Sequence, residues 1–167
     1  MLLTPEYIFA GVGRITPEFL QQKGITALAL DVDNTLTSHD SQELPPQVEQ
    51  WLAAMHAAGV RMFIVSNNEE ERVAPFAGRL GLEYVSKAAK PLPFGMKWLQ
   101  EKFGVEKSRL ALVGDQLFTD RLCGALYGVP VFVVEPLAPE IKPFIQFKRV
   151  LERPFIRRYY HKGGKLM

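Results

Sequence analysis

The sequence contains one cysteine, Cys123, among its 167 residues. A single cysteine cannot form an intramolecular disulfide, which excludes a disulfide-stapled scaffold and fits a reducing compartment. All apolar runs fall short of the roughly 18 residues that a membrane-spanning helix requires. The opening residues, Met1 to Glu6, also lack the basic segment of a secretion signal. We therefore expect a cytoplasmic protein.

A large excess of either charge is also missing, because the formal net charge is only +2. The two parts of the chain nevertheless differ. Residues 1–141 carry 12 Lys and Arg against 17 Asp and Glu, whereas residues 142–167 carry 8 Lys and Arg against a single acid, Glu152. A mildly acidic body with a basic end predicts that the tail meets any anionic partner.

Internal repeats and low-complexity linkers are absent as well, and 47% of the residues are hydrophobic, enough for one substantial core. Apolar segments that fit strands alternate with helical patterns. The predicted strands are 25–30, 60–65, 84–85, 110–113 and 129–134, and the predicted helices are 17–23, 46–58, 69–80, 94–103 and 119–127. This alternation predicts an α/β fold with a parallel sheet and helices on both faces. We expect a core of residues 1–137, including an N-terminal helical lead-in, and a basic tail of residues 138–167.

The segment from Ile25 to Thr37 starts as an apolar run and ends in two carboxylates, Asp31 and Asp33. A continuous apolar run is typical of a strand buried on both faces of a parallel sheet. Residues two apart on a strand point to the same side, and such sheets bind ligands at the carboxyl ends of their strands. A solvated turn is the alternative for the acids alone.

Five more candidate residues follow later segments. Ser66 and Asn67 come directly after residues 60–65, Lys90 lies in a loop, and Asp115 and Asp120 follow residues 110–113. Carboxylates gathered at one edge repel each other unless a cation neutralises them, and such hard oxygen ligands suit Mg²⁺. Lys90 and Ser66 could then hold phosphate oxygens, while Asn67 either lines the site or caps the next helix.

These groups together fit phosphoryl transfer, which depends on positioning and on stabilising charge. One carboxylate can attack phosphorus and form an aspartyl-phosphate. The other can protonate the leaving alcohol and then deprotonate the water that releases phosphate.

Four motifs in this order resemble those of the haloacid dehalogenase superfamily of phosphatases. They are the stretch from Asp31 to Thr35, then Ser66, then Lys90 with Pro91, and then the stretch from Gly114 to Asp120. The resemblance covers approximately residues 25–134.

The resemblance implies a role for each motif. Asp31 would be the nucleophile and Asp33 the general acid and base. Mg²⁺ would be held by Asp31, the main-chain carbonyl of Asp33, and Asp115, with support from Asp120. Ser66 and Lys90 would bind the transferred phosphoryl group, and we add Asn67 as a candidate phosphate-binding residue from its place beside Ser66.

More narrowly, the chain resembles the small YqeG-type proteins of subfamily IIIA, which are similar to mitochondrial phosphatidylglycerophosphate phosphatases. This narrower likeness includes Leu3-Thr4-Pro5, Gly24-Ile25 and the basic ending. The leading hypothesis is therefore removal of phosphate from phosphatidylglycerophosphate. A soluble sugar-phosphate or nucleotide phosphatase is the alternative. A catalytically idle module that binds RNA or a ribosome is a third reading, which we disfavour because it has no use for the acids.

The expected site has no cap domain. About thirty residues separate Asp33 from Ser66, and even fewer separate Ser66 from Lys90, whereas an independent domain needs at least about 50. An open site suits a phosphate on a large molecule such as a lipid, or it is closed by a second subunit of a homo-oligomer.

The tail shows a helical pattern of aromatic and aliphatic residues. The stripe consists of Phe144, Phe147, Leu151, Phe155 and Tyr159, with Arg149, Arg153 and Arg157 largely opposite. Either the stripe packs on the sheet and the arginines are solvated, or the tail lies on the inner face of an anionic membrane. Pro154 should break or kink this helix. Among single residues, we interpret His39 as a solvated loop residue, Lys87 as a weaker rival of Lys90, and Trp51 and Trp98 as core anchors.

Overall fold

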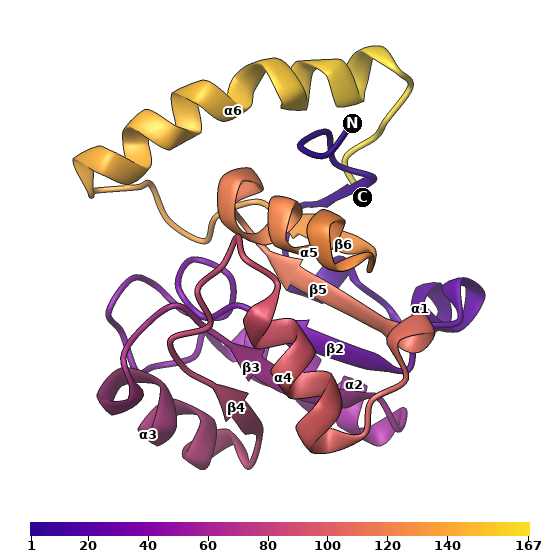
Figure 1. Ribbon diagram of the computed structural model, residues 1–167, viewed down its shortest axis with the longest axis vertical. Coiled ribbons are helices and arrows are strands. Elements are labelled where there is room, and N and C mark those ends of the chain that lie inside the picture. The colour runs from indigo at the N-terminus through magenta and orange to yellow at the C-terminus, as the bar shows by residue number, and fades with distance from the viewer.

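The computed structural model describes all residues, 1–167, and contains one six-stranded sheet (Figure 1). The strands are β1 (Tyr7–Phe9), β2 (Ala27–Leu30), β3 (Arg61–Val65), β4 (Glu83–Val85), β5 (Leu110–Gly114) and β6 (Val131–Val134). They are ordered β1-β6-β5-β2-β3-β4, and every pair is parallel. The expected parallel α/β architecture is confirmed. Strand β1, which is only three residues long, was not predicted.

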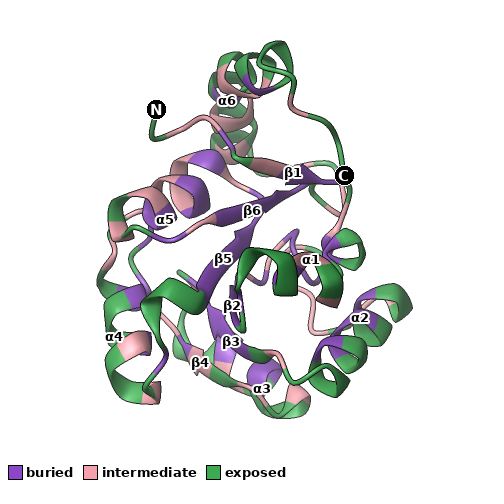
Figure 2. Cartoon of the chain, turned by 90° about the vertical axis from the view of Figure 1, so that its right-hand side faces the viewer, coloured by how far each residue is buried: buried purple, intermediate pink, exposed green.

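Helices cover both faces of this sheet (Figure 2). They are α1 (Pro17–Lys23), α2 (Pro46–Ala57), α3 (Glu70–Leu80), α4 (Phe94–Phe103), α5 (Leu122–Tyr127) and α6 (Pro143–His161). Helices α1, α2 and α3 pack on one face, and α4, α5 and the second half of α6 pack on the other. Each fully buried aliphatic side chain in these layers contributes about 1.5–3 kcal/mol. Trp51 is a core anchor as expected, and its indole N–H donates to the Ile15 carbonyl at 2.8 Å.

The predicted helix 119–127 is replaced by two elements. Residues Leu117–Arg121 form a π-helical turn, and α5 begins only after it. Within the turn the Asp120 carboxylate accepts a hydrogen bond from the Gln116 N–H at 3.1 Å. Wide helical turns of this kind are common at functional sites, and this one holds Asp120 inside the protein, where it is 1% exposed.

Helix α6 lies along one end of the molecule, above α5 (Figure 1). The break expected at Pro154 does not occur, because the helix continues through this residue. Pro154 lies on the exposed side, so the backbone carbonyl that it leaves unpaired is open to water. After α6 the chain returns to β1, where the Met167 N–H donates to the Ile8 carbonyl at 2.9 Å.

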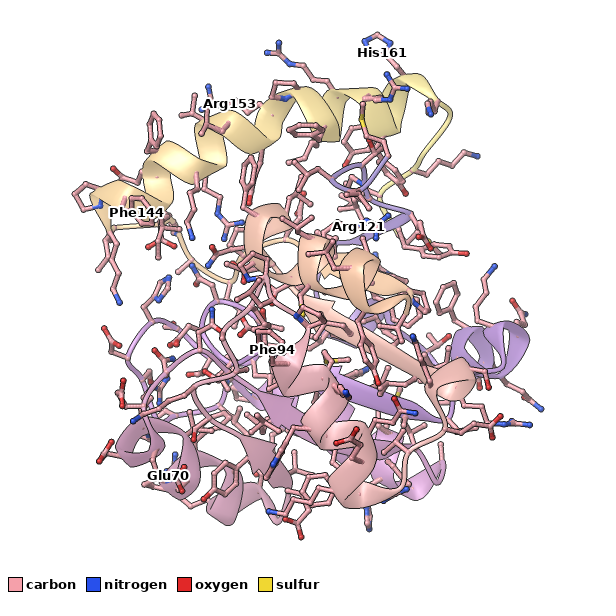
Figure 3. The ribbon with its side chains drawn as sticks, viewed as in Figure 1. Glu70, Phe94, Arg121, Phe144, Arg153 and His161 are labelled. Carbon is pink, nitrogen blue, oxygen red and sulfur yellow. The ribbon has the colours of Figure 1, made fainter.

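The orientation of α6 differs from the expected one. Only Phe155 and Tyr159 of the predicted stripe pack on the core. Phe144 and Phe147 are 71% and 59% exposed, and Leu151 is exposed as well. Arg149 and Glu152 face the protein instead, so the prediction of a fully solvated arginine face is wrong for Arg149. Arg153, on the outer side of the helix, remains exposed (Figure 3).

Candidate active site

The carboxyl ends of the central strands bring three carboxylates together. Asp31 follows β2 and Asp115 follows the neighbouring strand β5, and the Asp31 N–H continues their ladder by donating to the Val113 carbonyl at 2.9 Å. Asp120 reaches the same place from the π-helical turn. One carboxylate oxygen from each of Asp31, Asp115 and Asp120 lies within 4.8 Å of the others.

Lys90 inserts its ammonium group among these acids. Its Nζ lies 2.8 Å from Asp31 Oδ1 and 2.7 Å from Asp120 Oδ1, and its side chain is 2% exposed. The Asn67 amide holds the Lys90 backbone from both sides, accepting from its N–H at 2.7 Å and donating to its carbonyl at 2.8 Å. Asn67 therefore positions Lys90 and is not a helix cap. Direct contact between Asn67 and phosphate remains a prediction.

Asp33 lies outside the group of three acids, and separate hydrogen-bond donors hold its carboxylate. Its Oδ1 accepts from Arg72 Nη2 and from the Asp40 N–H, both at 3.0 Å, and its Oδ2 accepts from the Asn68 amide. Burial opposes ionisation here, but these hydrogen bonds outweigh it and hold the pKa of Asp33 below its usual range. Sequence reasoning missed Arg72. The one signal was a basic residue near the start of a helix, where the helix dipole disfavours it.

Ser66 follows β3 directly and is buried near the donors that hold Asp33. Its Oγ accepts from the Asn68 N–H at 3.1 Å, which leaves the hydroxyl proton available to another acceptor. The strand ends thus hold Ser66 next to Asn68, whose side chain in turn contacts Asp33.

Arg149 enters the site from α6, a contact that sequence reasoning also missed. Its guanidinium forms an ion pair with the Asp115 carboxylate, and Nη1 donates to the Asp115 carbonyl at 2.5 Å and to Glu152 Oε2 at 3.3 Å. Glu152 is held in turn by the Leu117 N–H at 2.7 Å. The signal in the sequence was Glu152 itself, the only acid of residues 142–167, three residues after Arg149 on the same helix face.

Comparisons with known proteins identify the family. The model of haloacid dehalogenase-like hydrolases matches residues 14–125. Over 159 residues the chain is 31% identical to the probable phosphatase YqeG of Bacillus subtilis (strain 168), and this match covers 95% of the chain and 92% of the relative. The chain belongs to the haloacid dehalogenase-like hydrolase family.

Two further proteins resemble this hydrolase. Phosphatidylglycerophosphate phosphatase 1, chloroplastic/mitochondrial, of Arabidopsis thaliana is 28% identical over 162 residues, which cover 89% of the chain but only 45% of that protein. A solved structure of a putative HAD family hydrolase from Streptomyces avermitilis MA-4680 is 27% identical with a TM-score of 0.53, covering 70% of this chain and 68% of that one. The expected family and fold are confirmed, and phosphatase is the activity class that these matches support.

The acids of this hydrolase are arranged as a cation site requires. Burial raises the pKa of Asp31 to about 8 even though Lys90 opposes the shift. It also raises the pKa of Asp115 to about 6, opposed by Arg149. The neighbouring carboxylates add to the effect of burial at both residues, with Asp120 and Asp115 raising the pKa of Asp31 and Asp120 raising that of Asp115. Buried carboxylate oxygens this close together are the ligands that Mg²⁺ prefers, so the residues present fit the metal that the family implies.

His39 is not a solvated loop residue in this hydrolase. Its side chain is 10% exposed, and Nε2 lies 2.7 Å from Glu140 Oε2. Its other ring nitrogen lies 4.0 Å from Asp33 Oδ1. Glu140, just before α6, is 101 residues away in sequence and carries no local signal for this contact.

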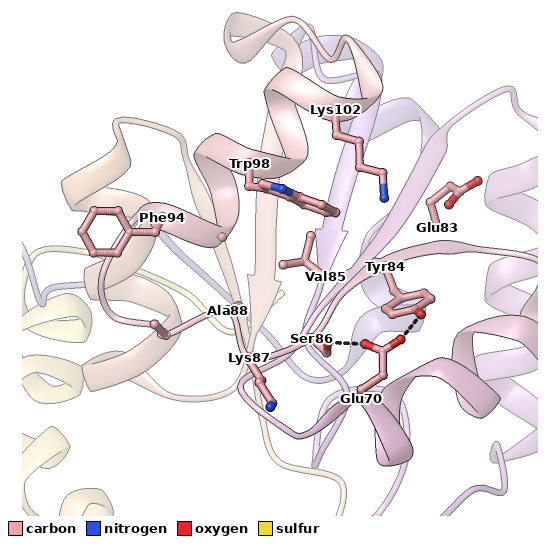
Figure 4. A pocket seen from close by; sticks show the side chains of 12 residues that line it. Glu70, Glu83, Tyr84, Val85, Ser86, Lys87, Ala88, Phe94, Trp98 and Lys102 are labelled. Carbon is pink, nitrogen blue, oxygen red and sulfur yellow. Dashed lines mark hydrogen bonds between the residues drawn. The ribbon is translucent and has the colours of Figure 1, made fainter.

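A hollow of about 820 Å³ lies beside β4 and α4 (Figure 4). Trp98 lines it and is 45% exposed, so the expectation of a core anchor is wrong for this residue. Lys87 also lines it and pairs with Glu69 at 2.9 Å, and both side chains are more than 60% exposed. Of the two rival lysines, the structure therefore brings only Lys90 to the carboxylates.

Proposed function

We propose that the protein is a Mg²⁺-dependent phosphomonoester phosphatase that acts through an aspartyl-phosphate on Asp31. The observation that carries this proposal is the buried cluster of Asp31, Asp115 and Asp120 around Lys90, in a chain of this family. Asp31, Asp115 and the main-chain carbonyl of Asp33 would hold Mg²⁺, which supplies positive charge that neutralises the phosphoryl oxygens.

The reaction would take two displacements. A carboxylate oxygen of Asp31 attacks phosphorus, and the bond from phosphorus to the alcohol oxygen breaks. The protonated form of Asp33 would supply the proton that this oxygen takes, against the hydrogen bonds that favour its ionised form. Water then attacks the phosphorus of the aspartyl-phosphate, Asp33 takes its proton, and inorganic phosphate leaves with Asp31 restored. Lys90 Nζ, already 2.8 Å from Asp31 Oδ1, would bind phosphoryl oxygens, as would the free hydroxyl proton of Ser66. Asp120, engaged by Lys90 and by the Gln116 N–H, would keep the lysine in place.

Release of phosphate from p-nitrophenyl phosphate tests this activity. We expect turnover with Mg²⁺, none after chelation of the metal, and recovery when Mg²⁺ is added back. A purified, folded protein that releases no phosphate from any phosphomonoester in the presence of Mg²⁺ would contradict the proposal.

We further propose a lipid substrate, phosphatidylglycerophosphate, converted to phosphatidylglycerol. The name of the Arabidopsis relative supports this choice, and so does the exposed apolar ridge of α6, formed by Phe144, Phe147 and Leu151. None of the helices combines the length and apolarity needed to cross a bilayer. Contact with the surface of an anionic membrane would instead use the ridge and the exposed basic residues that follow it, each contributing about 1 kcal/mol near the surface.

Vesicle flotation tests the membrane contact. We expect binding to vesicles that contain phosphatidylglycerol, weaker binding to pure phosphatidylcholine, and loss of binding in Phe147→Ser. The matched control is Phe94→Ser, because Phe94 is 64% exposed but lies on α4, away from the ridge. Equal binding by both variants would contradict a role for α6.

A further inference from the structure

Helix α6 holds the loop that follows β5 through two of its side chains. Arg149 Nη1 donates to the Asp115 carbonyl at 2.5 Å, and Nη2 pairs with the Asp115 carboxylate. Glu152, one turn later on the helix, accepts from the Leu117 N–H at 2.7 Å and from Arg149 Nη1 at 3.3 Å. Arg149 therefore has an anchor of its own, and it holds Asp115 at both the main chain and the side chain.

The basic side chains of the site take one oxygen each from Asp31 and Asp115. Lys90 Nζ lies 2.8 Å from Asp31 Oδ1, and Arg149 Nη2 contacts Asp115 Oδ2. The two remaining oxygens, Asp31 Oδ2 and Asp115 Oδ1, lie 3.4 and 3.3 Å from the buried hydroxyl oxygen of Thr35. A hydroxyl has one proton, so it can satisfy only one of them at a time. These two oxygens are therefore the ones that a cation can take without displacing a basic side chain.

Asp120 does not offer such an oxygen. Its Oδ1 lies 2.7 Å from Lys90 Nζ, and its Oδ2 accepts from the Gln116 N–H at 3.1 Å. Asp31 and Asp115 are thus the two carboxylates of this group with an oxygen that no protein nitrogen contacts. Which oxygen that is depends on the basic side chain that holds the other one.

The orientation of Asp115 needs such a hold. The last torsion of an aspartate side chain is broad and roughly two-fold, so a carboxylate that nothing holds can present either oxygen. The planar guanidinium of Arg149 contacts the carboxylate and the carbonyl of the same residue at once, which fixes this torsion. Because its positive charge repels a cation, Arg149 can favour metal binding only by orienting Asp115.

We propose that Arg149 is a positioning residue of the metal site. It keeps Asp115 Oδ1 free and beside the Thr35 hydroxyl, where Asp31 Oδ2 also lies, and Glu152 keeps Arg149 in place. Arg149 lies outside residues 14–125, the part of the chain that matches the family, so α6 adds this contact to the family's site. The inference rests on the proposed phosphatase function, which requires the metal.

Binding of Mn²⁺ without substrate tests the proposal, because oxygen ligands accept Mn²⁺ as well as Mg²⁺ and the paramagnetic resonance signal of the free ion reports its concentration. Arg149→Lys loses the planar fork but keeps the charge near the site constant. We expect its Kd for Mn²⁺ to rise about 10–100-fold, the usual loss when a group that orients a metal ligand is replaced.

The matched control is Arg109→Lys. Arg109 also pairs with an acid three residues away, Glu106 at 3.2 Å, but this pair is exposed and lies just before β5, at the end of that strand opposite Asp115. The control should bind Mn²⁺ with the wild-type Kd.

A second variant acts through the anchor. Glu152→Asp keeps the charge but shortens the side chain by one methylene group, which withdraws the carboxylate from Arg149 and from the Leu117 N–H. Its Kd for Mn²⁺ should rise about tenfold, and this variant decides if Arg149→Lys does not fold. Hydrolysis of p-nitrophenyl phosphate gives a second readout. The Mg²⁺ concentration for the half-maximal rate should rise in both variants, while kcat at saturating Mg²⁺ returns to the wild-type value.

The outcomes separate the positioning role from the function. An unchanged or lower Kd in Arg149→Lys, or an equal rise in Arg109→Lys, would overturn the role of Arg149, while Mn²⁺ binding and phosphate release by the wild-type protein upheld the function. A wild-type protein that binds no Mn²⁺ and releases no phosphate would overturn the proposed function, and the positioning role with it.

Discussion

Replacing Lys90 with methionine tests how the acids are held together in the metal-free protein. Lys90 Nζ lies 2.8 Å from Asp31 and 2.7 Å from Asp120, and the lysine and Asp120 side chains are 2% and 1% exposed. Burial opposes a charge on Lys90, but Asp120 and Asp31 outweigh it and raise its pKa. Because a raised lysine pKa gives stability that is complete below the unfolded-state pKa, near 10.5, its whole contribution is present at pH 7.

The expected loss follows from this geometry. Removing one partner of a buried ion pair costs about 3–5 kcal/mol. Asp31, whose pKa is already raised to about 8, can take up a proton and so avoid an unpaired buried charge. We therefore expect a value near the lower end of that range, about 3 kcal/mol, which for a chain of this length lowers Tm by roughly 6–12 °C.

Urea unfolding followed by circular dichroism, in buffer containing a chelator, measures this loss. The matched control is Lys87→Met, because Lys87 lies three residues earlier and its ion pair with Glu69 is exposed. We expect the control to unfold at the wild-type midpoint. A Lys90→Met protein as stable as wild type, or an equal loss in both variants, would refute the reasoning that Lys90 neutralises the buried acids.

Three shorter predictions concern the nucleophile and two glycines. Asp31→Asn should abolish phosphate release from p-nitrophenyl phosphate without changing the circular dichroism spectrum, and retained hydrolysis would remove Asp31 as nucleophile. Gly114→Ala should destabilise the protein by about 1–3 kcal/mol and lower kcat, because the added methyl group would overlap the Asp120 carboxylate. Gly78→Ala lies inside α3 with no atom within 4 Å of the added methyl group, so it should raise the free energy of unfolding by about 0.4–1 kcal/mol. A lower free energy of unfolding in this variant would contradict the open space around Gly78.

Much of the fold could be predicted because its signals are local. Apolar runs that end in polar residues identified the central strands, and glycines ended the predicted helices. Gly24 follows α1 with φ of 69°, a left-handed conformation that glycine adopts without strain. Asp31, Asp115 and Lys90 could be grouped from the order of strands and loops along the chain, because parallel strands present their carboxyl ends at one edge of the sheet.

The tertiary structure alone decided what surrounds those residues. A helical pattern shows which residues of 143–161 share a face, but not which face turns inward. Partners elsewhere in the chain accompany that choice, since Arg149 pairs with buried Asp115 and Glu152 accepts from the Leu117 N–H, while Phe144 is left exposed. Arg149 is 34 residues from Asp115 in sequence, so no local pattern could predict their contact. The sequence by itself thus determined the sheet and the carboxylates at its edge, whereas the basic residues that contact those carboxylates from other helices depended on long-range packing.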